Sequence, residues 1–127
     1  MDIEKHILYW VDSSVEDIET AEILVEKSRT RHGLFFAHLA VEKMLKAHVC
    51  LQSQEPAPRI HNLLRLAQKT PLEPSEKHSL FFARFDRYQI EGRYPEFSPV
   101  KISAESAAKE LKSAQEVLEW LKMQLKK

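Results

Sequence analysis

The sequence is poor in glycine, with only 2 among its 127 residues. Tight turns between β-strands depend on residues that tolerate positive φ, and glycine is the main one. Such turns should therefore be rare, which favours long helices over sheets. So few glycines also cannot build a glycine-rich loop around a nucleotide phosphate. A phosphate would have to be bound by Lys, Arg or helix N-termini instead.

The sequence also has a single cysteine, no net charge and no long apolar run. Cys50 is the only cysteine, which excludes an internal disulfide and a cysteine-rich zinc site and is typical of the reducing cytoplasm. The 19 Lys and Arg balance 19 Asp and Glu, so overall charge gives no signal for nucleic acid or membrane binding. No apolar run reaches the roughly 18 residues of a membrane helix, and we expect neither a membrane segment nor a signal peptide.

What is present is an ordinary globular composition, 43% hydrophobic and 30% charged, in a chain whose length fits a single domain spanning residues 1–127. Apolar residues recur at helical spacing in three long segments and two short ones. These are residues 3–27, 33–52, 61–69, about 76–90, and a last segment that begins after Ser103. The pattern predicts an all-α, up-and-down helical bundle of about five helices.

Local signals predict where these helices end. Asp2, Ser75 and Ser103 are of the residue types that cap helix N-termini. Gly33 predicts the break between the first two long helices. Residues 91–102, which contain two prolines, predict an irregular loop.

The segment FFAHLAVEKMLKAHVC within residues 33–52 is apolar nearly all round, which predicts a central helix. Its polar residues His38, Glu42 and Lys46 are spaced i, i+4, i+8, so they share one ridge. The residues alone favour a solvated edge, with His38 and Glu42 hydrogen-bonded and Glu42 paired with Lys46. The alternative is that the ridge is a ligand site. His48 projects elsewhere, and we expect it to pack or cap.

Other residues could bind a ligand, and each also has a structural interpretation. His38 and Glu42 could provide two metal ligands and His61 a third, but the sequence has no HExxH motif, and we predict neither a metal nor a cofactor. In RYPEF, either Tyr94 and Phe97 pin a loop onto the bundle while Arg93 caps carbonyls at a helix end, or Arg93 and Tyr94 face a nucleotide or partner.

Several motifs recur together in order. FFAHLAVEKMLKAHV is followed by a proline-bearing gap, then HNLLRLA, then RYPEF, and finally a helix that begins near SAESAAKEL. This order resembles the HEPN-domain family, whose pattern has an A-x-EK-x-LKA core helix, a short helix that opens with His, and a late RYP. The matching residues are Ala40, Glu42, Lys43, Leu45, Lys46, Ala47, His61, Arg93, Tyr94 and Pro95. The resemblance covers essentially the whole chain.

The resemblance implies a helical bundle, often homodimeric through its long helices, in a small prokaryotic protein frequently paired with a minimal nucleotidyltransferase, as in toxin–antitoxin modules. Many members cleave RNA with an Arg-x4–6-His motif, whereas others bind nucleotides without catalysis. Arg31 and His38 formally satisfy Arg-x6-His. However, His38 occupies the core-helix position, the catalytic motif of active members lies later, and no histidine follows His78.

Three hypotheses follow. The first is a non-catalytic or weakly catalytic cytoplasmic homodimer that binds a nucleotide or a nucleotidyltransferase through Lys43, Lys46, His61, Arg93 and Tyr94. The second is a metal-independent endoribonuclease toxin that uses Arg31 and His38. There the histidine would act as general acid or base on the ribose 2′-hydroxyl, and the arginine would stabilise charge on the phosphate. The third is a structural helical dimerisation module.

Overall fold

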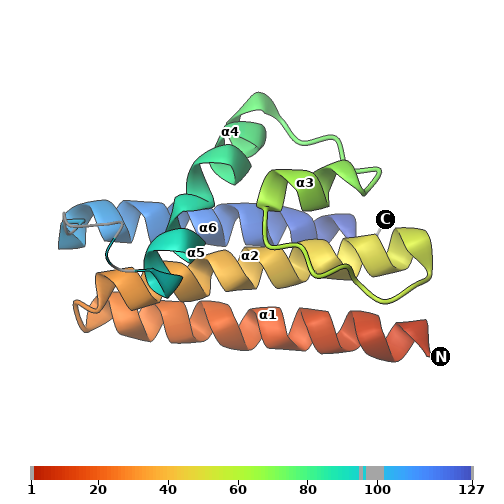
Figure 1. The fold of residues 1–127 in the computed structure, drawn as a ribbon, viewed down its shortest axis with the longest axis horizontal. Helices are drawn as coiled ribbons and strands as arrows, with labels where there is room; N and C mark the ends of the chain where they lie inside the picture. Colours follow the sequence, from red (N-terminus) through yellow and green to blue (C-terminus); the bar gives the residue numbers. More distant parts are fainter. Residues whose placement is uncertain (1, 95, 97–101, 127) are drawn as a thin grey trace.

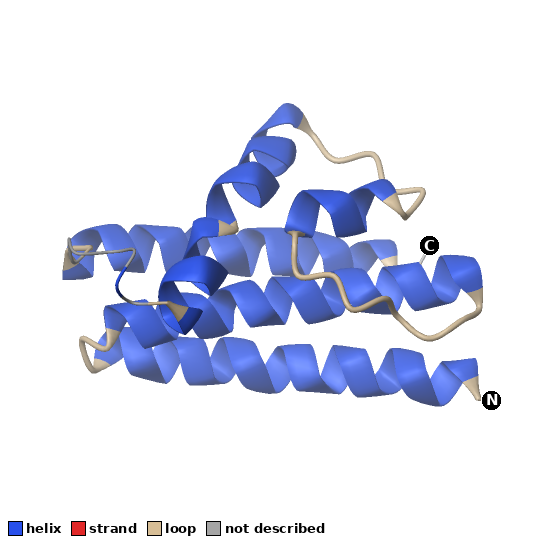
Figure 2. Cartoon of the chain, viewed as in Figure 1, coloured by secondary structure: helices blue, strands red, loops and turns tan. Residues whose placement is uncertain are grey.

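The computed structural model describes residues 2–94, 96 and 102–126, and its regular elements in this part of the chain are all helices (Figures 1 and 2). The long helices α1, α2 and α6 run side by side, and the short helices α3, α4 and α5 form a second layer over them. The bounds are α1 (Ile3–Glu26), α2 (Thr30–Ser53), α3 (Leu63–Gln68), α4 (Glu76–Phe85), α5 (Arg87–Arg93) and α6 (Ala104–Gln124). The predicted all-α bundle is confirmed.

Helix α2 is the centre of the bundle, as its composition predicts. It packs against α1 and α6 in its own layer and against α3 and α5 in the second (Figure 1). From residue 37 to residue 50, only Leu39 and Lys43 are more than marginally exposed. The apolar excess of α2 is therefore satisfied inside a single protomer.

The predicted N-caps are confirmed. The side-chain oxygens of Asp2, Ser75 and Ser103 each accept a hydrogen bond from the backbone N–H three residues on, at 3.1–3.2 Å. Each bond satisfies one of the donors that a helix N-terminus leaves without a partner.

The predicted break at Gly33 is wrong. The chain turns at Ser28, whose φ is 63°, and α2 begins at Thr30, so Gly33 lies inside α2. A Cβ atom at this position would lie 2.6 Å from Val25 Cγ2 and 3.3 Å from the carbonyl oxygen of Ala21. The missing side chain thus allows α1 and α2 to approach closely. The hydroxyl of Ser14 joins the same two helices by donating to the carbonyl of Ala40 at 2.6 Å.

The single helix predicted for residues 76–90 is in fact two helices, because α4 ends at Phe85 and α5 begins at Arg87. The second of them runs on to Arg93, into the segment predicted to be a loop. Asp86, between the two, turns its carboxylate inward, where it accepts a hydrogen bond from the N–H of Leu63 at 3.1 Å. The bend lets aromatic rings from both helices pack together, with Phe85 4.5 Å from Phe81 and 4.7 Å from Tyr88 between ring centroids.

His48 packs as predicted. It is buried on α2, and its Nε2 lies 2.8 Å from the carbonyl oxygen of Leu121 near the end of α6, so Nε2 carries the proton and donates. Burial lowers the pKa of His48 from its ordinary value of 6.5, and this effect outweighs the hydrogen bond to Leu121. The folded protein therefore holds this imidazole neutral.

We expect Gly33→Ala to destabilise the protein by about 1–2 kcal/mol, although alanine normally stabilises a helix relative to glycine. The new methyl group collides with Val25 and with the backbone of α1. Urea unfolding measures the change. Adding Val25→Ala removes the closest clashing atom and should recover part of the loss. A Gly33→Ala protein more stable than the parent would contradict the close approach of the two helices.

His48 should make the protein less stable in mild acid. Because its pKa is lower in the folded than in the unfolded state, its contribution is complete above about pH 6.5 and is lost as the pH falls through that value. His48→Gln keeps an N–H donor for Leu121 and should flatten the fall in unfolding free energy between about pH 7 and pH 5. His32→Gln, at an exposed position of α2, is the control. An unchanged slope in His48→Gln would argue against a buried neutral imidazole.

Candidate functional site

The polar ridge of α2 is enclosed rather than solvated. His38, Glu42 and Lys46 share one face of the helix, as their spacing predicts, but their exposed fractions are only 0%, 3% and 6%. The interpretation of the ridge as a solvated edge is therefore wrong. The second layer of helices, which contacts α2 through α3 and α5, covers this face (Figure 1).

Glu42 is the centre of one half of this buried network. Its Oε2 lies 3.0 Å from Nζ of Lys46, which confirms the predicted ion pair, and 3.2 Å from Nδ1 of His61. The ammonium of Lys46 also lies 5.2 Å from the ring centroid of Trp10 on α1. Half of the His61 side chain remains exposed, at 47%, so this imidazole joins the network to the surface.

Asp86 is the centre of the other half. Its Oδ1 lies 2.9 Å from Nε2 of His38 and also accepts the N–H of Leu63 at the start of α3. The predicted hydrogen bond between His38 and Glu42 is not formed, because His38 Nδ1 and Glu42 Oε1 are 3.7 Å apart. Both of these atoms are buried without a hydrogen-bond partner.

The network is an electrostatic unit that joins both layers. It contains two carboxylates, Glu42 and Asp86, one ammonium and two imidazoles. Buried charges are tolerated only when they are paired and hydrogen-bonded, and here each carboxylate has contacts from two different elements. The arrangement thus fixes the second layer over α2.

The second layer has its own anchor on α6. Glu110 accepts two hydrogen bonds from the guanidinium of Arg84 on α4, at 3.0 and 3.3 Å, and one from the hydroxyl of Tyr88 on α5, at 2.7 Å. Burial raises the pKa of the Tyr88 hydroxyl, and the hydrogen bond to Glu110 raises it further. Tyr88 therefore stays a proton donor and helps to hold the second layer on α6.

The predicted ligand-binding residues do not form one site. The structure brings Lys46 and His61 together around Glu42. Lys43 lies on another face of α2, where its Nζ is 2.7 Å from both Asp17 Oδ2 and Ser13 Oγ of α1. Both lysines are thus paired with acidic side chains of the same chain.

Arg93 and Tyr94 lie at the end of α5. The guanidinium of Arg93 is 5.4 Å from the ring centroid of Phe35, and its Nε donates to Gln89 at 3.0 Å. Phe35 precedes Lys46 by eleven residues of one helix, which is about 16 Å along its axis. Tyr94 is 52% exposed. The other predicted loop anchor, Phe97, and the adjacent Pro95 lie outside the described residues.

Arg31 and His38 also differ in their surroundings. Arg31 is in the first turn of α2 and partly buried, about 10 Å along the helix axis from His38. The imidazole of His38 has no exposed surface, and its Nε2 is bonded to Asp86. A general acid or base must come within hydrogen-bond reach of the substrate proton, and neither ring nitrogen is accessible for this.

Two further features bear on function. Within residues 2–94, 96 and 102–126, no group of three or more His, Cys, Asp or Glu side chains is arranged to hold a metal ion. None of the helices in these ranges combines the length and apolar character needed to cross a membrane.

Removing the charge of Glu42 should destabilise the protein strongly. Glu42→Gln leaves the buried ammonium of Lys46 without its anionic partner, which is expected to cost about 3–5 kcal/mol in chemical denaturation. Glu42→Gln combined with Lys46→Met removes both charges and should recover most of that loss. Glu91→Gln breaks the ion pair with the exposed Arg87 and should change stability by less than about 1 kcal/mol. Additive losses in the double variant would contradict a coupled buried pair.

Similar folds occur in two solved structures. The protein TT1696 from Thermus thermophilus superposes with a TM-score of 0.80 at 21% identity, over 92% of this chain and 96% of that one. ST0689, described as an archaeal HEPN homologue, gives 0.74 at 21% identity, over 93% and 96%. At such identities the likeness concerns the fold. No curated protein matches the chain.

The sequence itself matches the family model described as "HEPN domain" over residues 7–124. The match includes the A-x-EK-x-LKA segment of α2, the histidine before α3, the last arginine of α5 and the tyrosine that follows it. Because it spans nearly all of the sequence, the chain belongs to the HEPN-domain family.

Proposed function

We propose that this chain is a non-catalytic cytoplasmic HEPN module that acts by binding proteins. Its partners would be a second copy of itself and a minimal nucleotidyltransferase, as in a toxin–antitoxin pair. The observation that carries the proposal is a groove between α1 and α6, lined by apolar and charged side chains, on the side of the bundle that the second layer leaves open.

The groove is about 280 Å³ in volume and is lined by apolar side chains from three helices together with four polar ones, Glu22, Gln115, Glu119 and Lys122. Val15 and Ile18 of α1 form one wall, Leu118 of α6 belongs to the other, and Met44 of α2 lies between them. Leu8, 60% exposed, is two helical turns before Val15 and extends the same face of α1. An exposed apolar surface continuous with a groove is typical of a protein–protein contact.

Helices α1 and α6 have matching patterns of burial along their lengths. From residue 11 to residue 26 and from residue 111 to residue 126, the two helices follow the same order of buried, half-buried and exposed positions. Each therefore buries one side against α2 and turns another to solvent. Such a pair of flanking helices can meet the same pair from a second copy, because a two-fold dimer uses the same surface on both subunits.

The buried ridge supports the non-catalytic part of the proposal. The histidine of the Arg-x6-His pair is a structural side chain that holds Asp86. Nucleotide binding through Lys43 and Lys46 is less well supported than protein binding, because both ammonium groups are already paired with carboxylates. Of the predicted nucleotide-binding residues, His61, Arg93 and Tyr94 retain exposed positions.

A charge on the face of α1 that continues from the groove should disrupt the dimer. We expect the full chain, 14.8 kDa, to have about twice this mass in solution by light scattering, and Leu8→Glu to dissociate it into monomers. Leu8 is exposed in the protomer, so the substitution should leave the fold intact. Leu80→Glu is a matched control, because Leu80 is 59% exposed but lies on α4 in the second layer.

Two outcomes would overturn the proposal. One is a parent chain that is monomeric and fails to copurify with a co-expressed minimal nucleotidyltransferase. The other is RNA cleavage by the parent that His38→Ala abolishes in a still-folded protein. The second outcome would establish the endoribonuclease hypothesis in its place.

A further inference from the structure

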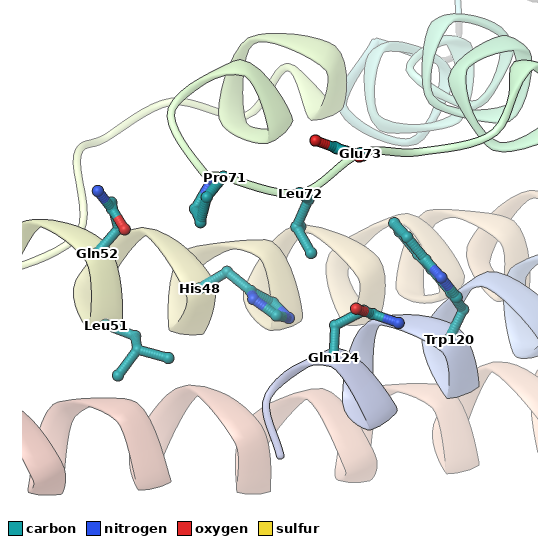
Figure 3. Close-up of a pocket in the computed structure, with 8 residues that line it drawn as sticks. All are labelled: His48, Leu51, Gln52, Pro71, Leu72, Glu73, Trp120 and Gln124. Atoms are coloured by element: carbon teal, nitrogen blue, oxygen red, sulfur yellow. The ribbon is translucent and has the colours of Figure 1, made fainter. Parts of the chain in front are cut away.

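A second hollow lies at the end of the bundle where α2 and α6 terminate (Figure 3). It is a cleft of about 470 Å³ below the connection between α3 and α4, a size that suits a small molecule. Helix α2 contributes His48 and Gln52 to its lining, and the connection contributes Leu72 and Glu73. Trp120 and Gln124 come from the last two turns of α6.

The described side chains that line the cleft include an acidic one and no basic one. Among the described residues that line it, none is Lys or Arg, and Glu73 is the one carboxylate. Two long helices, α2 and α6, also end beside it at Ser53 and Gln124 (Figure 1). The C-terminal end of a helix carries a partial negative charge and attracts cations. The α6 end has Lys122 in its last turn to offset this charge, whereas the last turn of α2 has no basic residue.

His48 adds a hydrogen-bond acceptor to the same cleft. Its Nε2 carries the proton that is donated to Leu121, so the remaining nitrogen, Nδ1, has a free lone pair while the ring is neutral. Figure 3 shows the His48 ring directed into the cleft toward Gln124, whose amide oxygen can accept as well. The polar groups of the cleft thus favour a ligand that donates N–H groups.

Trp120 supplies a flat aromatic surface. Its ring packs against that of His78, with 4.7 Å between the centroids, which fixes its orientation at one end of the cleft. In Figure 3 the indole stands beside Leu72, opposite His48 and Gln52. The face of an indole attracts a cation and stacks on a planar group.

We infer that this cleft binds a small planar organic cation rich in N–H donors, such as an amidinium or a guanidinium. The cationic plane would stack on Trp120, and its N–H groups would donate to Glu73, to His48 Nδ1 and to the glutamine amides. A ligand with a phosphate group is disfavoured, since the described lining residues include no Lys or Arg to pair with it. The cleft lies on a different face of α6 from the groove of the proposed dimer, so the inference is independent of partner binding.

Benzamidinium is a suitable probe, because it joins an aromatic ring to a planar cation. Titration of the full ¹⁵N-labelled chain should give saturable NMR shifts in the last turns of α2 and α6. The chain has 2 tryptophans, and the indole N–H of Trp120 should move while that of Trp10, outside the cleft, stays in place. Benzoate has nearly the same shape with the opposite charge and should give no saturable shift.

Charge variants distinguish binding in the cleft from a general attraction of the cation to the protein. Glu73→Gln should weaken benzamidinium binding about threefold to fivefold, as expected for one partly solvated ion pair. Glu55→Gln removes an exposed carboxylate that does not line the cleft and should leave the affinity unchanged. Equal binding of benzoate, equal shifts of both indoles, or equal effects of the two variants would overturn the inference.

Discussion

The ion pair between Glu42 and Lys46 is the interaction on which the rest of the structure depends. Two charges on the central helix of a bundle can stay ionised only if other groups replace the water that they lose. His61 and Trp10 provide this replacement for the pair, and Asp86 and His38 complete the network beside it. These contacts hold the start of α3 and the junction of α4 and α5 over α2.

This constraint changes how the motifs of the family are interpreted in this chain. The residues of the A-x-EK-x-LKA segment and the histidine before α3 are the ones most easily taken for a ligand site. In the folded protein Glu42, Lys46 and His61 bind one another, and Lys43 binds α1. The two surfaces for which we propose functions lie outside the ridge: the groove between α1 and α6 and the cleft beside Trp120.

The sequence predicts most of the fold because the relevant signals are local. Apolar periodicity identifies the helices, and cap residues such as Ser75 and Ser103 mark where they begin. The break predicted at Gly33 is wrong because glycine permits both a turn and a close contact between helices. Only the position of Val25 in the folded protein shows that the close contact is the reason for this glycine. The periodicity of residues 76–90 likewise cannot show that the helix is interrupted at Asp86, whose carboxylate bonds to the start of α3.

The candidate site is less predictable for a different reason. Helical spacing correctly places His38, Glu42 and Lys46 on one ridge, but it cannot show what lies opposite them. The cover comes from segments more than a dozen residues away, and the partner of His38 is 48 residues further along the chain. An aspartate between the aromatic residues of FFARFDRY is the one sequence signal that could have indicated an inward-facing carboxylate.

The central claim is that the polar ridge of α2 faces a closed protein interior. Long-range ¹H–¹⁵N NMR of the imidazole rings tests it most directly. A buried Nε2–H of His38 bonded to Asp86 should give a resolved signal that exchanges slowly with water and disappears in Asp86→Ala. A ring proton on His38 that exchanges as fast as that of the exposed His32 would contradict the account.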